Sequence, residues 1–144
     1  MQDPGQTPGA VPASASDELQ AQLVGFCADA GIAYCGLIDH AAGNGQMIAS
    51  HTATGASPRN PVELSELASR FFLAGRQLAT QFGESEAHGL HQCGARWHSF
   101  LIPLSERIIL LSIFDSDTLV GVVRRSAERW RSDLVQAVAK KSPD

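Results

Sequence analysis

The sequence of 144 residues lacks most of the signals that mark an enzyme or a membrane protein. It holds only two lysines, Lys140 and Lys141, and neither follows a glycine-rich loop, so a P-loop for nucleotide hydrolysis is excluded. No serine lies in the G-x-S-x-G motif that an α/β-hydrolase nucleophile requires. No apolar run approaches the roughly 20 residues that a membrane-spanning helix needs. We therefore expect a protein that has no catalytic residues and does not bind a membrane.

Cysteine is scarce as well. Cys27, Cys35 and Cys93 are odd in number, lie far apart and form no C-x-x-C pair, which argues against a disulfide framework and for a reducing compartment. Residues 1–15 are rich in Pro, Gly and Ser and lack the basic start and apolar centre of a signal peptide, so we expect a disordered leader before one domain at 16–141. A net charge of −4 does not favour nucleic acid as a partner. The composition predicts a cytoplasmic protein.

The hydrophobic pattern predicts eight elements in the order α-β-β-α-β-β-β-α. Short links between successive strands favour hairpins, and hence an antiparallel sheet with helices on both faces. The strand at 107–115 is apolar throughout, so we expect both of its faces to be covered. The expected helices are one from Ser14 or Ser16 to Ala30, one at 62–82 and one at 119–138; the expected strands are 32–39, 46–52, 88–95, 96–104 and 107–115.

The glycine-rich stretch GLIDHAAGNGQMIAS at 36–50 links the first two predicted strands. A dinucleotide-binding fingerprint needs a further glycine where Ile48 stands, and a helix where this sequence predicts a strand. Gly43, Asn44 and Gly45 are instead typical of a hairpin turn, whose backbone angles other residues resist. We therefore interpret this stretch as structural.

The same hairpin resembles a known family. A strand that ends in Asp39, a glycine-bearing turn and the short apolar strand MIAS resemble the opening of the roadblock family, which includes dynein light-chain roadblock and its bacterial relatives. After the middle helix, the run FLIPLSERIILLSIFDSDTLVGVVR resembles the ending of that family, with Pro103, Asp115, Gly121 and Arg124 at the matching places. The first hairpin is somewhat longer here than is typical of the family.

The resemblance covers roughly residues 17–140 and is to the bacterial, MglB-like type. It implies a profilin-like α/β sandwich of the α+β class: a five-stranded antiparallel sheet with the middle helix on one face and the two terminal helices on the other. It also implies homo- or heterodimers that pair middle helices and third strands, and a non-catalytic regulator or scaffold. Proteins of the MglB-like type bind a small Ras-like GTPase and stimulate its GTP hydrolysis. The alternative is a profilin- or GAF-like sensory module for a small ligand, which a polar-lined cavity in the core would favour.

The predicted middle helix carries two apolar stripes. The first consists of Leu64, Leu67, Phe71, Ala74, Leu78 and Phe82, and we expect it to lie on the sheet. The second consists of Ala68, Phe72, Gly75 and Ala79, and we expect it to form the interface of a homodimer because one sheet cannot bury both stripes. The side away from the first stripe carries Glu66, Arg70, Leu73 and Gln77, where we expect the GTPase to bind.

His88, His91, Cys93 and His98 are the candidate metal ligands. On one strand, His91 and Cys93 share a face while His88 points to the other. A zinc site would also need His98 from the next strand and a fourth ligand. We therefore expect a polar edge strand that holds no metal, and a protein without a cofactor.

Overall fold

The computed structural model describes residues 15–41, 44–55 and 57–141, and it confirms the predicted order of elements. The elements are α1 (Ala15–Ala30), β1 (Tyr34–Asp39), β2 (Gln46–Thr52), α2 (Pro61–Thr80), β3 (Leu90–Cys93), β4 (Trp97–Pro103), β5 (Ile108–Asp115) and α3 (Val120–Lys141). The predicted leader, apart from Ala15, and Gly43 of the predicted turn lie outside the described residues. None of the three helices that the structure describes is long and apolar enough to cross a membrane.

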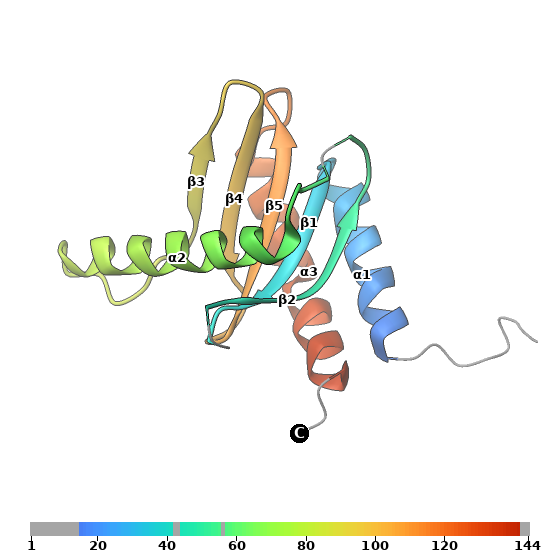
Figure 1. Ribbon diagram of the computed structural model, residues 1–144, viewed down its shortest axis with the longest axis horizontal. Helices are drawn as coiled ribbons and strands as arrows, with labels where there is room; N and C mark the ends of the chain where they lie inside the picture. The colour runs from blue at the N-terminus through green and yellow to red at the C-terminus, as the bar shows by residue number, and fades with distance from the viewer. Residues whose placement is uncertain (1–14, 42–43, 56, 142–144) are drawn as a thin grey trace, which may run out of the picture.

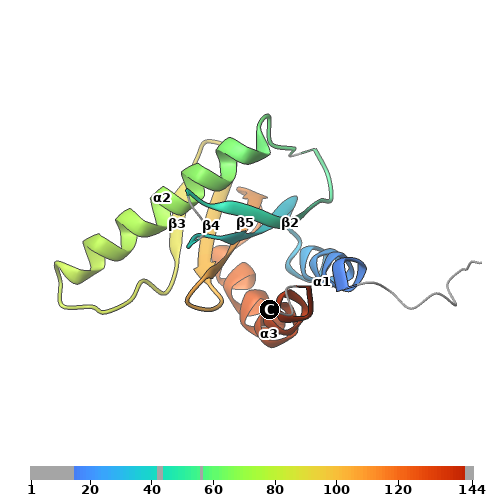
Figure 2. The same cartoon turned by 60° about the horizontal axis from the view of Figure 1, so that its bottom comes forward.

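The five strands form one sheet in the order β2-β1-β5-β4-β3, and every neighbouring pair is antiparallel. Helix α2 lies across one face of this sheet, and α1 and α3 cover the other (Figures 1 and 2). The central strand β5 is buried along nearly all of its length, as the apolar run at 107–115 predicts. The predicted fold class is therefore confirmed.

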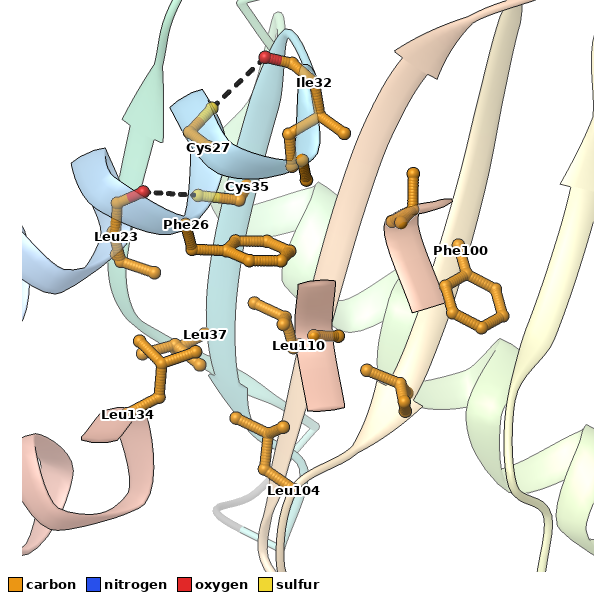
Figure 3. Close-up of a cluster of buried hydrophobic side chains, with 14 of the residues drawn as sticks. Leu23, Phe26, Cys27, Ile32, Cys35, Leu37, Phe100, Leu104, Leu110 and Leu134 are labelled. Atoms are coloured by element: carbon orange, nitrogen blue, oxygen red, sulfur yellow. Dashed lines mark hydrogen bonds between the residues drawn. The ribbon is translucent and has the colours of Figure 1, made fainter. Parts of the chain in front are cut away.

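A larger core fills the space between the sheet and the pair α1 and α3 (Figure 3). Two of the three cysteines lie in it and behave as packing residues. The Sγ of Cys27 donates a hydrogen bond to the backbone oxygen of Ile32 at 3.3 Å, and the Sγ of Cys35 donates to that of Leu23 at 3.7 Å. The contact with Cys27 and burial both raise the pKa of Cys35, so this thiol stays protonated and unreactive.

Asp29 joins α1 to α3. Its Oδ2 accepts hydrogen bonds from Arg129 at 2.6 Å, from Ser126 at 2.7 Å and from the indole nitrogen of Trp130 at 3.0 Å. The hydrogen bond from Arg129, with those from Ser126 and Trp130, lowers the pKa of Asp29 to about 2. The two helices on this face are therefore held together by a charged carboxylate as well as by apolar packing.

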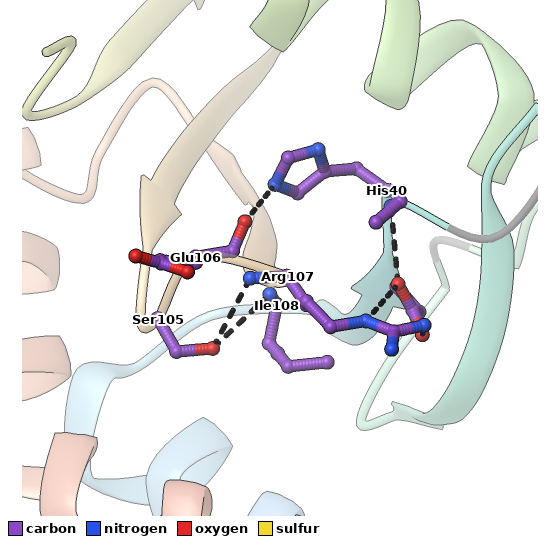
Figure 4. A network of polar contacts seen from close by, with 7 residues as sticks. His40, Ser105, Glu106, Arg107 and Ile108 are labelled. Carbon is purple, nitrogen blue, oxygen red and sulfur yellow. Dashed lines mark hydrogen bonds and ion pairs between the residues drawn. The ribbon is translucent and has the colours of Figure 1, made fainter.

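The β1–β2 hairpin and the β4–β5 turn meet at one end of the sheet (Figure 4). The guanidinium of Arg107 donates to a carboxylate oxygen of Asp39 at 2.8 Å, and the Nε2 of His40 lies 2.8 Å from the backbone oxygen of Glu106. Gly45, with a φ of +108°, lies against the first turns of α2, where the hydroxyl of Ser65 donates to its backbone oxygen at 3.4 Å. The predicted hairpin is thus present, and Asp39 and His40 take part in local structural contacts.

Candidate protein-binding surface on helix α2

Helix α2 has a well-defined start. Asn60 is its N-cap, with extended backbone angles, and its side-chain oxygen accepts a hydrogen bond from the backbone nitrogen of Glu63 at 3.1 Å. Pro61 occupies the first turn, where its missing N–H costs nothing, and Glu63 places a negative charge near the positive end of the helix dipole. These residues fix where the helix begins and therefore which side of it faces the sheet.

The side that faces the sheet is the stripe of small residues, which corrects the sequence prediction. Ala68 and Phe72 are buried, and they pack in a second core with side chains of β1, β4 and β5. Ser65 and Ser69 are buried on the same side. Since the intramolecular core already covers Ala68 and Phe72, they do not form an exposed surface for a second copy. The predicted dimer interface of Ala68, Phe72, Gly75 and Ala79 is therefore wrong in placing this stripe outward.

Gly75 shows why the small stripe faces inward. A Cβ atom on Gly75 would lie 2.5 Å from both terminal carbons of the Leu90 side chain on β3. A side chain at position 75 would have to push Leu90 aside, whereas glycine lets the helix pass this close to the edge of the sheet. Ala79, one turn later, is half-buried. The stripe that rests on the sheet is thus the one with small residues at positions 68, 75 and 79, with the large side chain of Phe72 filling the second core between them.

The larger apolar residues form a stripe that is mostly exposed. Leu64 packs against the second core, but Leu67, Phe71, Ala74, Leu78 and Phe82 are exposed, Leu78 by 63% and Phe82 by 80%. We call the five exposed residues the α2 apolar stripe; the last of them, Phe82, lies in the turn directly after the helix. The C-terminal half of α2 extends beyond β3 at the edge of the sheet (Figure 1). The sheet therefore cannot cover the end of this stripe.

Strand β3 is the outermost strand on this side and pairs only with β4 among the described strands. Its outer edge presents unpaired backbone N–H and C=O groups, which a further strand can pair with. The open edge of β3 lies beside the overhanging half of α2 (Figure 1). Since Gly75 of α2 approaches Leu90 of β3 closely, the apolar part of the helix and the strand edge that can pair with a further strand are neighbours.

The four residues predicted to bind a partner lie together on the outer side of α2. Arg70, Leu73 and Gln77 are exposed, with Leu73 at 46%, and Glu66 is half-buried. They recur three and four residues apart, so they share one helix face that adjoins the α2 apolar stripe. The structure thus brings these side chains to one surface, and a partner for that surface stays a prediction.

The three candidate metal ligands that the sequence placed on two strands lie together. Cys93 on β3 pairs directly with His98 on β4, and His91 Nε2 lies 3.0 Å from His98 Nδ1 and 3.6 Å from Cys93 Sγ. Burial, and then the neighbouring His98, lowers the pKa of His91. His88 lies outside this cluster. The sequence argued against a metal partly because His98 would have to come from the next strand. The pairing of β3 with β4 brings His98 to Cys93, so this argument no longer holds.

An open cleft of about 900 Å³ lies between α2, the α2–β3 loop, the β4–β5 turn and α3. Its arginines already have partners within the chain. Arg131 donates to Glu128 at 3.0 Å, Arg76 lies over the ring of Phe72, and Arg124 lies over the ring of Phe100. This cleft is at the surface, whereas the sensory-module alternative predicts a polar cavity within the core.

No protein-family model and no curated protein sequence matches this chain. Solved structures do match it over most of its length. An MglB protein with a tetrameric arrangement superposes with a TM-score of 0.78 at 21% identity, over 91% of this chain and 95% of that one. A roadblock/LC7 domain from Streptomyces avermitilis gives 0.71 at 13% identity, over 83% and 96%. A profilin from Schizosaccharomyces pombe gives 0.56 at 16% identity, over 82% and 97%.

The two roadblock-type structures superpose better than the profilin, although all three share the sandwich architecture. The element order, the five-stranded antiparallel sheet and the helices on its two faces agree with the resemblance found in the sequence. This chain has the fold of the MglB and roadblock/LC7 structures.

Proposed function

We propose that this protein is a non-catalytic, dimeric regulator or scaffold that binds a small Ras-like GTPase and modulates its GTP hydrolysis. The observation that carries the proposal is the α2 apolar stripe, exposed beside an open strand edge in a chain with the MglB-like fold. Contiguous exposed apolar surface on a soluble chain marks a site of protein interaction.

The first occupant of this surface is a second copy of the chain. Two copies related by a two-fold axis would place stripe against stripe and β3 edge against β3 edge, so each patch complements itself. Such an arrangement buries the overhanging Leu78 and Phe82, which the chain alone leaves in water. It also pairs the free backbone groups of β3. The homodimer would therefore cover the exposed apolar residues and pair the open edge of β3 at the same time.

The GTPase binds the adjoining face of α2. Leu73 is the apolar residue on that face, and Glu66, Arg70 and Gln77 surround it with polar groups. A small apolar centre with a polar rim is a common form of interaction hot spot. In the homodimer the two α2 helices lie side by side, so this face becomes a two-helix platform. The protein would act by reorganising the switch regions of the GTPase, because no arginine here lies in a recognisable finger motif.

The test is binding of purified small Ras-like GTPases from the same organism, beginning with any encoded beside this chain, measured by calorimetry with GDP or a GTP analogue bound. Leu73→Asp and Arg70→Glu should weaken binding at least about tenfold, the effect of losing roughly 1.4 kcal/mol at a hot spot. Light scattering should show both variants still dimeric. Arg125→Glu, the same charge reversal on an exposed position of α3, is the matched control and should bind normally.

Two results would contradict the proposal. If no small GTPase binds the wild-type protein in either nucleotide state, the function itself is wrong. If a GTPase binds but Arg125→Glu weakens the complex while Leu73→Asp and Arg70→Glu do not, the docking surface lies on α3 rather than on α2.

A further inference from the structure

The tip of the β3–β4 hairpin carries two imidazoles and a thiol that converge on one point. The possible ligand atoms of His91, Cys93 and His98 all lie within 4.8 Å of one another. His91 and Cys93 come from alternate positions of β3, so they share one face of the sheet, and the β3–β4 register places His98 directly opposite Cys93 on that face. Backbone pairing thus places all three side chains on one face at neighbouring positions.

Two of the three distances among these atoms are close to those of a tetrahedral zinc site. With Zn–N bonds of about 2.0–2.1 Å and Zn–S bonds of about 2.3 Å, neighbouring ligand atoms are separated by roughly 3.3–3.7 Å. The two imidazole nitrogens are 3.0 Å apart, and Cys93 Sγ is 3.6 Å from His91 Nε2. The ion would need the two imidazole nitrogens slightly farther apart, and Cys93 and His98, whose ligand atoms lie within 4.8 Å of each other, would close around it.

The surroundings also fit a metal site that is open to solvent. The ring centroid of Phe114 lies 5.9 Å from that of His91 and 5.6 Å from that of His98, so the ring of Phe114 covers one side of the cluster. His91 and Cys93 are exposed and His98 is half-buried, which leaves a path for the ion to enter. Cys93 is the one exposed cysteine of the three, whereas Cys27 and Cys35 are buried.

We propose that His91, Cys93 and His98 bind one Zn²⁺ ion per chain, with a solvent molecule as the fourth ligand. Two imidazoles and a thiolate suit zinc, a borderline-soft divalent ion, better than they suit magnesium or calcium, which take oxygen ligands. Binding releases the thiol proton of Cys93 and replaces the hydrogen bond between His91 and His98. The ion would fasten the edge strand β3 to β4 at the hairpin tip. The site lies on the sheet face opposite α2, so the zinc proposal can be tested independently of the GTPase proposal.

The test uses the full, tag-free, reduced chain after treatment with a chelator. Titration with Co²⁺ should give the intense visible bands of a tetrahedral site and a thiolate-to-cobalt charge-transfer band, both saturating at one ion per chain and disappearing when Zn²⁺ is added. Cys93→Ser should lose the charge-transfer band. His98→Gln should weaken binding by more than about 100-fold, because loss of even an outer-shell partner costs 10–100-fold. His51→Gln, a histidine on the opposite edge strand β2, is the matched control and should bind as the wild type does.

A second readout follows the thiol itself. Zn²⁺ should slow alkylation of Cys93 by iodoacetamide, measured by mass spectrometry, while circular dichroism checks that each variant is folded. The proposal is overturned if the wild type takes up no more metal than Cys93→Ser does. It is also overturned if metal saturates at half an ion per chain, since the ligands would then be shared between two chains, or if Zn²⁺ leaves alkylation of Cys93 unchanged.

Discussion

Gly75 of α2 passes over Leu90 of β3 so closely that an added Cβ would meet both terminal carbons of the leucine at 2.5 Å. This contact fixes the side of α2 that faces the sheet. An alanine in a helix normally stabilises it by about 1 kcal/mol relative to glycine. At position 75 the new methyl group must instead displace Leu90, and overpacking of this kind costs about 1–3 kcal/mol.

We therefore predict that Gly75→Ala lowers the free energy of unfolding, and that Leu90→Ala in the same chain removes much of that loss. Urea denaturation of the single and double variants measures the coupling between the two positions. Gly121→Ala is the matched control, because a Cβ at that position in α3 meets nothing within 4 Å. A Gly75→Ala chain that is more stable than the wild type would contradict this prediction, because Leu90 would then yield to the added methyl group at little cost.

If the α2 apolar stripe forms the proposed homodimer interface, charges placed on it should disrupt the dimer. Phe71→Glu and Leu78→Glu each place a charge where two copies would meet, and an unpaired buried charge costs several kcal/mol, so both variants should be monomeric. Sedimentation velocity at several protein concentrations measures this. Leu73→Glu makes the same kind of change on the neighbouring face and should remain dimeric. A dimer that survives both stripe substitutions would place the interface elsewhere.

The low pKa of Asp29 leads to a prediction of how the stability of the fold depends on pH. Its pKa is about 2 in the folded chain and near 3.9 in an unfolded one, so its contribution is fully present above about pH 4 and is lost as the pH falls toward 2. Asp29→Asn should lower the melting temperature at neutral pH and make it fall less steeply between about pH 4 and 2. Asp133→Asn, at an exposed position on α3, should leave the wild-type profile nearly intact. Parallel profiles for wild type and Asp29→Asn would contradict the proposed role.

The sequence was sufficient for the fold because each element has a clear period or a clear end. Gly31 ends α1 with a positive φ of +69°, and Asn60 and Pro61 begin α2 as capping rules require. The unbroken apolar run of β5 likewise identified a strand covered on both faces. These signals are local, so they can be recognised without knowledge of the tertiary contacts.

The sequence was not sufficient for the surface of α2 or for the cluster on β3 and β4. Counting apolar residues favoured the stripe with Phe71 and Leu78, but close approach to the sheet requires small residues such as Ala68 and Gly75. Hydrophobicity alone does not contain that steric information. The meeting of Cys93 with His98 depends on strand register, which becomes fixed only when the turn at 94–96 forms.

We propose that this chain modulates a small Ras-like GTPase. The most direct measurement is single-turnover hydrolysis of GTP bound to that GTPase, with and without an excess of this protein. We predict a hydrolysis rate that changes with the concentration of this protein and saturates, with Leu73→Asp shifting the curve to higher concentrations. We also predict no hydrolysis by this protein alone. A rate that stays constant at saturating concentrations would contradict the claim.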